Sequence, residues 1–226
     1  MLQDFLRMST EQALFRFEGA ECRERWSLFS DAEYGGRSTS SLEQATSSTA
    51  VWSGRTEVEI DEENAAISTE SGRRATKAGW CAMRADVSHD GWDLSDFHGI
   101  RMRLRPDDRR YILNIRTFGI LGGEDVDIFQ AIVPPAPTPG EWCELRMPFS
   151  AFHLTSRGYI QANQNRTMHL GNLRHIGLLL ADHTTGDFQL ELEEIEAFRF
   201  GEDEMARDGG VQEMLRNNED MGYNAA

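Results

Sequence analysis

The sequence predicts an all-β fold, a sandwich or jelly roll built from two packed sheets. Apolar residues recur in short runs of strand length, turn residues separate these runs at short intervals, and no sustained helical stripe of apolar residues is present. About nine or ten such strands indicate a sandwich. With 226 residues the chain is long enough to bury a core, and a sandwich of this size commonly stays a single domain.

The first expected strands occupy residues 14–17, 26–29, 51–54 and 58–60, where aromatic and aliphatic residues gather. Residues 33–38 contain Gly35 and Gly36, which permit positive φ, so a tight turn is expected there. The polar residues 61–77 are expected to form a loop.

The clearest strand spans residues 100–105, where apolar residues alternate strictly with Arg101, Arg103 and Arg105. A period of two places the arginines on one face of a sheet and the apolar residues on the other. Pro106 ends this strand, and the turn that follows predicts a hairpin with residues 111–117 as its partner. The arginines of this strand pair, which include Arg116, are therefore expected on one sheet face.

Further strands are expected at residues 142–147, 175–181 and 188–192. Residues 175–181 are almost continuously apolar, which is typical of a strand buried on both faces. The doublet Glu193–Glu194 shifts the phase of the last alternating run, so that Ile195 and Phe198 continue its apolar face. A β-bulge at the doublet would produce this shift.

The two ends of the chain differ from this pattern. Residues 1–12 are expected to form a short amphipathic arm, residues 13–200 the sandwich and residues 201–226 an acidic tail. The tail carries seven acids and two arginines, a net charge of 2 − 7 = −5.

The formal net charge of −15 argues against nucleic acid or anionic lipid as the main partner, because both require a cationic surface. Cys22, Cys81 and Cys143 are too few and too scattered for a disulfide framework, which fits a reducing compartment. No apolar run reaches the roughly 18 residues of a membrane span.

The usual catalytic and cofactor motifs are absent, and the histidines do not stand at metal-ligand spacing. We therefore predict no catalytic, cofactor-binding or metal-binding residue. Two carboxylate pairs, Glu191 with Glu193 and Asp125 with Asp127, have the composition of a glycosidase pair. A solvated sheet face produces the same pattern.

Five arginines are the candidate partner-binding residues: Arg101, Arg103, Arg105, Arg116 and Arg157. The alternative is that the strand arginines pair across the sheet with acids such as Glu191 and Glu193, since a guanidinium holds a carboxylate bidentately. A sugar-binding surface would use exposed aromatic rings, for which Tyr34, Trp52, Trp80, Trp92 and Trp142 are the candidates. Aromatic residues beside strands more often belong to the core.

Eight short segments, taken in order, carry a family resemblance: residues 26–38, which contain Ser-Asp-x-x-x-Gly-Gly-x-Ser, and residues 79–84, 92–97, 111–115, 142–152, 157–158, 176–182 and 186–191. Together they resemble the complex I intermediate-associated protein 30 family. The chain departs from the family at Arg105-Pro106-Asp107-Asp108-Arg109, where the family tends to have Arg-Gly-Asp-Gly-Arg. A plain turn is expected there instead of a close backbone approach to a ligand.

The resemblance implies a galactose-binding-like jelly roll and a non-catalytic assembly factor, a chaperone or scaffold, for mitochondrial NADH:ubiquinone oxidoreductase. Such a protein would act without a cofactor on the matrix side of the inner membrane, peripheral to it. Its partners would be membrane-arm subunits in assembly intermediates, together with other assembly proteins. The acid-containing N-terminus does not resemble an organellar presequence, so a mature or truncated form is expected, with a chloroplast or bacterial relative as the alternative.

Two other functions stay open from the sequence. One is a carbohydrate-binding module or a degenerate glycoside-active domain, for which the aromatic residues would serve as sugar platforms. The other is a permanent structural subunit of a respiratory complex, as opposed to a transient assembly factor.

Overall fold

The computed structural model describes residues 11–59, 78–87, 91–117, 127–156, 159–162, 164 and 167–201. Residues 1–10 of the predicted arm (residues 1–12), the whole predicted polar loop (residues 61–77), the candidate Arg157 and residues 202–226 of the acidic tail lie outside these ranges.

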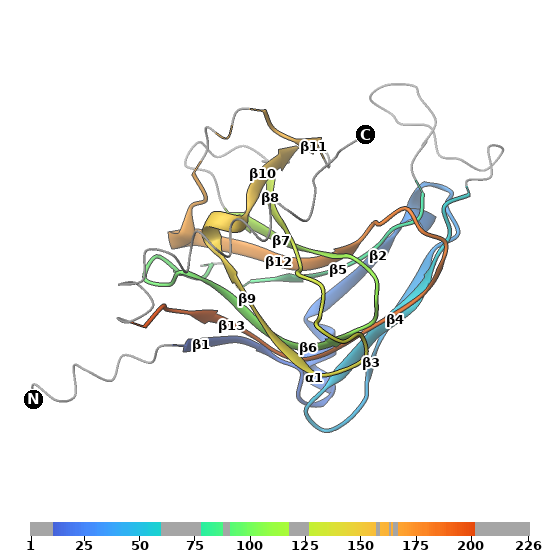
Figure 1. The fold of residues 1–226 in the computed structure, drawn as a ribbon, viewed down its shortest axis with the longest axis horizontal. Helices are drawn as coiled ribbons and strands as arrows, with labels where there is room; N and C mark the ends of the chain where they lie inside the picture. The colour runs from blue at the N-terminus through green and yellow to red at the C-terminus, as the bar shows by residue number, and fades with distance from the viewer. Residues whose placement is uncertain are drawn as a thin grey trace, which may run out of the picture.

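Two antiparallel sheets pack face to face, which confirms the predicted all-β sandwich (Figure 1). In sheet A the strand order is β3-β4-β13-β6-β9, and β1 also pairs with β13. Its strands are β1 (Glu11–Arg16), β3 (Thr39–Gln44), β4 (Ala50–Thr56), β6 (Gly99–Pro106), β9 (Cys143–Pro148) and β13 (Gly186–Phe198).

In sheet B the strand order is β11-β10-β8-β7-β12-β5-β2. Its strands are β2 (Trp26–Ser30), β5 (Cys81–Asp86), β7 (Tyr111–Thr117), β8 (Asp127–Ile132), β10 (His153–Ser156), β11 (Tyr159–Ile160) and β12 (Leu173–Leu180). The helical elements are short: α1 (Gly19–Glu24), η1 (Asp31–Tyr34), η2 (Phe149–Ala151) and η3 (Leu170–Asn172).

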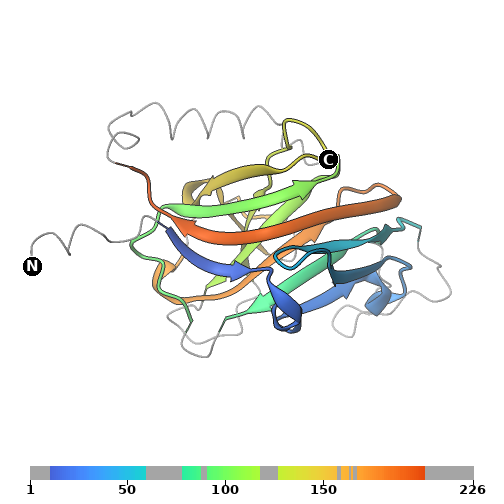
Figure 2. The ribbon, with the colours of Figure 1, turned by 90° about the horizontal axis from the view of Figure 1, so that it is seen from below.

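The long strand β13 organises sheet A. Figure 2 shows β13 in orange-red between β6 in green on one side and β1 in blue on the other. The predicted bulge in this strand is confirmed, because its register against β6 shifts between Leu192 and Glu194. The shift lets Ile195 and Phe198 continue the buried face of the strand.

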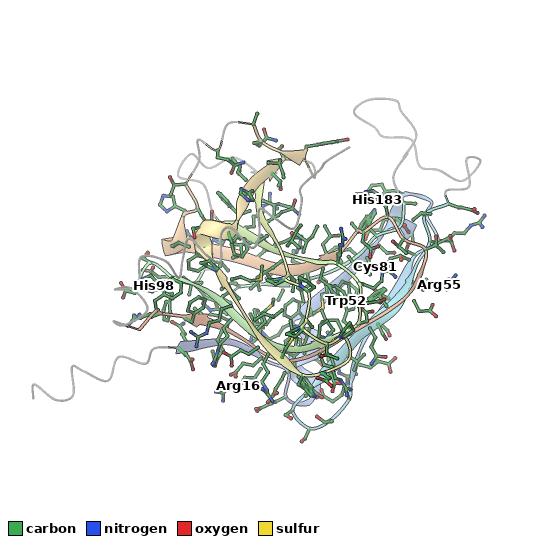
Figure 3. All side chains as sticks on the ribbon, viewed as in Figure 1. Arg16, Trp52, Arg55, Cys81, His98 and His183 are labelled. Atoms are coloured by element: carbon green, nitrogen blue, oxygen red, sulfur yellow. The ribbon has the colours of Figure 1, made fainter. Side chains whose placement is uncertain are left out.

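Alternate residues of the paired strands form one core between the sheets. Trp52 is fully buried at its centre, and its ring centroid lies 5.0 Å from that of Phe188 and 5.9 Å from that of Tyr111. Figure 3 places Trp52 between the two layers of strands. The alternating burial that the sequence predicts for the strands is therefore found in both sheets.

The predicted hairpin of residues 100–105 with residues 111–117 is wrong. β6 belongs to sheet A, where it pairs with β13 and β9, whereas β7 belongs to sheet B, where it pairs with β12 and β8. Residues 107–110 carry the chain from sheet A to sheet B. The apolar faces of both strands still point into the one core between the sheets. Local alternation is identical in the two arrangements, so it does not distinguish them.

Two smaller predictions also need correction. Residues 57–59 do not continue as a strand after β4, and Val58 is exposed. β12 is buried on its core side through Ile176, Leu178 and Leu180, but Leu179 on the opposite side is only half-buried. The near-continuous apolar run therefore leaves an apolar side chain on the outer face of sheet B.

Candidate functional site

Asp31 explains the Ser-Asp-x-x-x-Gly-Gly-x-Ser segment by internal hydrogen bonding. Its carboxylate is fully buried and accepts hydrogen bonds from the Ser38 amide at 2.8 Å, the Ser38 hydroxyl at 2.7 Å and the Gly79 amide at 2.5 Å. Gly35 ends η1 with φ of 89°, and a Cβ on Gly36 would lie 2.3 Å from Cγ of Asp31. The predicted tight turn is confirmed, and its residues fix the fold.

The outer face of sheet A carries an arginine ladder, defined here as Arg101, Arg103 and Arg105 of β6 with their acidic partners. Arg101 forms ion pairs with Glu11 at 2.9 Å, with Glu144 at 3.3 Å and with Glu196. Burial and a hydrogen bond with neighbouring Glu194 raise the pKa of Glu196, although Arg101 opposes that shift.

The other two ladder arginines are also paired. Arg103 Nε lies 2.5 Å from Glu193 Oε2, and Arg105 forms an ion pair with Glu191. The interpretation of cross-strand pairing with these two acids is confirmed. The same pairing ties both carboxylates of the candidate Glu191–Glu193 couple to arginines.

The ladder also covers one candidate sugar platform. The guanidinium carbons of Arg103 and Arg105 lie 5.7 and 5.8 Å from the ring centroid of Trp142. Trp52 is buried in the core, whereas Tyr34 is exposed beside the half-buried Trp80, with ring centroids 6.4 Å apart. The candidate aromatic residues therefore do not form one surface.

Arg116 lies on the other side of the molecule from the ladder, because β7 belongs to sheet B. We call the outward-pointing side of sheet B the open face. Arg116 forms no hydrogen bond or ion pair with any residue that the structure describes. The structure thus separates Arg116 from Arg101, Arg103 and Arg105, and Arg157 lies outside the described residues.

An apolar row crosses the open face. The strand registers place five half-buried residues side by side, one from each of β8, β7, β12, β5 and β2: Ile132, Ile112, Leu179, Ala82 and Phe29. Side chains alternate along a strand, and these five fall out of phase with the buried core residues of their strands. All five therefore point away from the core.

A polar row runs beside the apolar row. Nε2 of Gln130 donates to Oδ1 of Asn114 at 2.8 Å, and Asn114 stands opposite Gly177 of β12. A Cβ on Gly177 would lie 2.7 Å from the Met83 carbonyl oxygen, so only glycine fits here and no side chain rises above the sheet at this position. Opposite Gly177 in β5 stands Arg84, whose guanidinium carbon lies 4.9 Å from the centroid of the Phe29 ring.

A third row carries the remaining charges. Nδ1 of His175 lies 2.6 Å from Oδ1 of Asp86, and Nε of Arg84 lies 3.0 Å from the same oxygen. Arg116 stands directly opposite His175 in the register of β7 and β12. Asp86 is shared by Arg84 and His175, so among the described residues no carboxylate of this face is left for Arg116.

A cavity of about 580 Å³ lies where the apolar row ends. It is lined by the crossing between β6 and β7 and by the proline-rich segment after β8: Pro106, Asp107, Asp108, Arg109, Arg110, Tyr111, Ile132, Val133, Pro134, Pro135, Ala136 and Pro139. The Val133 amide donates to the Tyr111 carbonyl at 2.9 Å, and the Gly140 amide donates to the Pro106 carbonyl at 2.7 Å. These bonds hold the two connections together around the cavity.

A buried ion pair that the sequence did not reveal supports this end of the sandwich. Nε and Nη2 of Arg109 each lie 2.7 Å from a carboxylate oxygen of Asp182. Although burial alone would raise it, the pKa of Asp182 is lowered by the bond to Arg109, and the same bond raises the pKa of Arg109. The Asp182 carboxylate also accepts a hydrogen bond from the Thr184 amide at 3.2 Å, which holds the turn after β12.

Cys81 is a buried thiol of the core, and burial raises its pKa to about 11. Across the described ranges, no group of His, Cys, Asp and Glu side chains comes together as a metal site. No helix in the described part of the chain is long and apolar enough to cross a membrane.

Comparison with solved structures shows the fold. A family 11 carbohydrate-binding module from Clostridium thermocellum, solved with a β-1,3-1,4-mixed-linked tetrasaccharide, superposes with a TM-score of 0.57 at 17% identity over 84% of this chain and 95% of its own. A family 30 carbohydrate-binding module gives a TM-score of 0.53 at 8% identity, over 87% of this chain and 91% of its own.

Sequence comparison identifies the family. The mitochondrial complex I intermediate-associated protein 30 of Drosophila melanogaster is 25% identical over 190 residues, 83% of this chain and 62% of the relative. A probable member from Caenorhabditis elegans is 27% identical over 208 residues, 86% of this chain and 57% of the relative. The chain thus spans about three-fifths of these relatives. Since the profile of the family, described as Complex I intermediate-associated protein 30 (CIA30), matches residues 15–192, the chain belongs to that family.

Proposed function

We propose that this protein is an assembly factor for mitochondrial respiratory complex I, acting as a scaffold or chaperone without chemistry of its own. One observation carries the proposal: the family match covers residues 15–192, which is nearly the whole sandwich from β1 into β13. The matched residues include the Asp31 turn and the strands of both outer faces. The family relationship therefore applies to nearly the whole sandwich and not to one part of it.

The finer proposal is that the protein binds membrane-arm intermediates on the matrix side of the inner membrane, together with other assembly proteins. The relatives named mitochondrial support the compartment. Sheet B supports protein binding, because its open face presents half-buried apolar residues and Arg116, which pairs with no carboxylate in the part of the chain that the structure describes. Arg116 is proposed as a contact residue of that face, whereas Arg101, Arg103 and Arg105 would have to exchange their internal carboxylates for those of a partner. Arg157 stays a proposed contact.

Deletion of the gene in the source organism, followed by native gels of its mitochondria, tests the proposal. We expect a loss of mature complex I, a stalled membrane-arm intermediate, and co-migration of the wild-type protein with that intermediate. Re-expression of the wild-type chain should restore mature complex I. Normal complex I levels in the deletion strain would contradict the proposal, and stoichiometric presence in the purified mature enzyme would instead indicate a permanent subunit.

A sugar-binding function is the second candidate, and the polar row is the observation that favours it. The side-chain amides of Gln130 and Asn114 lie next to each other and can hydrogen-bond sugar hydroxyls. Gly177 beside them has no side chain that would block a sugar. Titration with a β-1,3-1,4-linked tetrasaccharide tests it. Saturable binding that is lost in Asn114→Ala would support this function. If millimolar sugar produced neither a heat of binding nor a chemical-shift change, the function would be contradicted.

A further inference from the structure

We propose that the open face docks an amphipathic segment of a partner polypeptide, apolar along one side and carrying at least one carboxylate on its flank. This inference rests on the proposed function, because it names the chemistry of the partner that an assembly factor would hold. Four observations carry it: the apolar row, the lack of a carboxylate at Arg116 among the described residues, the cavity at the end of the row, and the internal ion pairs of the ladder arginines on the opposite face.

The apolar row supplies the non-polar half of the docking surface. Its five residues come from five neighbouring strands, so the row runs across the sheet for about 19 Å at the usual strand spacing. An outer sheet face of a water-exposed antiparallel sheet is normally polar. A continuous half-exposed apolar row on such a face is typical of a surface that another chain covers.

The length and width of the surface fit a polypeptide segment. A distance of about 19 Å corresponds to roughly six extended residues or thirteen helical ones. Arg116 lies four residues beyond Ile112 on β7, about 13 Å along the strand, which is close to the 10–12 Å diameter of one helix with its side chains. A segment seated on the apolar row would therefore have its flank beside Arg116.

Charge complementarity specifies an acid on that flank. The charged and titratable groups of the described open face are Arg84, Asp86, Arg116, His175 and the exposed His153. The single carboxylate among them already contacts Arg84 and His175. The face thus has an excess of positive charge on a protein of net charge −15, and a carboxylate of the partner would complete the ion pair at Arg116.

The cavity extends the same surface. Ile132 belongs both to the apolar row and to the cavity lining, which continues through Pro134, Pro135 and Ala136. A volume of about 580 Å³ accepts a large side chain from the end of a docked segment. Asp108 and Arg110 are exposed on its rim and hold opposite charges, so the rim does not alter the charge balance of the face.

The aromatic content of the open face favours a polypeptide over a glycan. Phe29 is the only ring in the apolar row, and the guanidinium of Arg84 lies over it at 4.9 Å. A sugar ring would need such an aromatic face uncovered, whereas aliphatic Ile112 and Leu179 pack against side chains of a protein segment. On the described outer face of sheet A, by contrast, the ladder arginines are already paired with carboxylates of this chain.

Site-specific photo-crosslinking in the intact organelle tests the inference. We would introduce p-benzoylphenylalanine in place of Leu179 or Ile112, and in place of Val51 as the matched control. Val51 is likewise a half-buried aliphatic residue pointing outward from a strand, but on sheet A. After irradiation, mass spectrometry identifies the crosslinked peptide.

We expect both open-face probes to label the same partner segment, one with apolar residues on one side and Asp or Glu beside them, and the Val51 probe not to label it. Arg116→Glu should lower the crosslinking yield about tenfold, and Arg116→Lys should retain most of it. Thermal melting of each variant serves as the control, and a melting temperature close to that of the wild type would show that the sandwich is still folded.

Adducts to lipid, to a glycan, to a second copy of this chain or to a segment without acids would overturn the inference, as would equal labelling from Val51. Native gels of the same organelles separate this outcome from the proposed function. Continued co-migration with a complex I intermediate, without the expected adduct, overturns the docking surface alone. Loss of co-migration by the wild-type chain overturns the proposed function itself.

Discussion

Asp31 shows how a single buried carboxylate replaces several backbone contacts at a loop junction. It joins the turn after β2 to residues 79–80, which precede β5, through donors on Ser38, Gly79 and Trp80. The donors of these bonds are three backbone amides and one hydroxyl. Hydrogen bonds to a charged acceptor of this kind are stronger than neutral ones.

Asp31→Asn should lower the free energy of unfolding by about 3 kcal/mol, because an amide group would face amide donors and the charged acceptor would be lost. Urea unfolding followed by tryptophan fluorescence measures the change. Asp96→Asn is the matched control, since Asp96 is 74% exposed and its contact with Arg199 is 3.5 Å long. We expect less than about 0.5 kcal/mol there, and equal losses at both sites would contradict the role of Asp31.

Asp182→Asn should destabilise the protein by about 3 kcal/mol at pH 7, because it leaves Arg109 buried without its carboxylate. The pKa of Asp182 is lowered from 3.8, so the carboxylate stabilises the fold fully above about pH 3.8 and loses this effect as pH falls through its lowered value. The wild-type and variant unfolding curves should therefore converge at low pH. Urea titrations from pH 7 down to pH 3 measure this, and a gap that stays constant would refute the assignment.

At the scale of elements, the arginine ladder converts the alternation of β6 into a connection across sheet A. Arg101 reaches carboxylates on β1, β9 and β13, and its side chain is only 18% exposed. Arg103 is 50% exposed and pairs with Glu193 at the bulge. The same residue type in the same strand therefore makes contacts of different value.

Arg101→Ala should cost about 2–3 kcal/mol, whereas Arg103→Ala should cost about 0.5 kcal/mol. Loss of Arg101 leaves the buried carboxylate of Glu196 without its cation and raises the pKa of Glu196 further. The deficit of Arg101→Ala should then shrink as pH falls and Glu196 is protonated. Chemical denaturation at pH 7 and pH 4.5 measures both variants, and similar costs at the two positions would argue against the ladder as described.

The sequence predicted the elements better than their pairing. Period-two alternation and charge type predicted the bulge at Glu193–Glu194, the Glu191 and Glu193 ion pairs and eight strands: β1, β2, β4, β6, β7, β9, β12 and β13. Strands β3, β5, β8, β10 and β11 were not predicted. The hairpin between β6 and β7 was wrong because an inter-sheet crossing has the same local pattern. The pairing of Arg109 with Asp182, 73 residues apart, depends on where two turns meet in space, which no local pattern records.

The open face was hidden from the sequence for a related reason. Each of its apolar residues, such as Ile112 and Leu179, sits in a run that is apolar on both sides, which is typical of doubly buried strands. Only the registers of five strands place them in one row. The apolar runs that hold Phe29, Ile112 and Leu179 were predicted as strands, but the runs that hold Ala82 and Ile132 were not, and neither was the exposed side of the row.

At the scale of the whole molecule, β1 decides where the folding unit begins. It pairs with the last strand, β13, and contributes Phe15, while Phe17 directly after it is also fully buried. Phe17 stacks on Trp26 with ring centroids 5.5 Å apart, and Phe15 lies 5.1 Å from Trp92. The two ends of the described chain therefore close the sandwich together.

A chain of residues 11–201 should consequently unfold cooperatively, whereas a chain of residues 18–201 should lose its cooperative transition. The shorter chain lacks β1 and exposes the aromatic pocket that Phe15 and Phe17 fill, and each lost core phenylalanine costs about 3–5 kcal/mol. That sum approaches the whole stability of a typical domain. Calorimetry of both chains tests this, with Phe15→Leu in residues 11–201 as the control that keeps β1 and loses only part of its packing. A cooperative transition in residues 18–201 would show that β1 is an addition to the sandwich and not part of its closure.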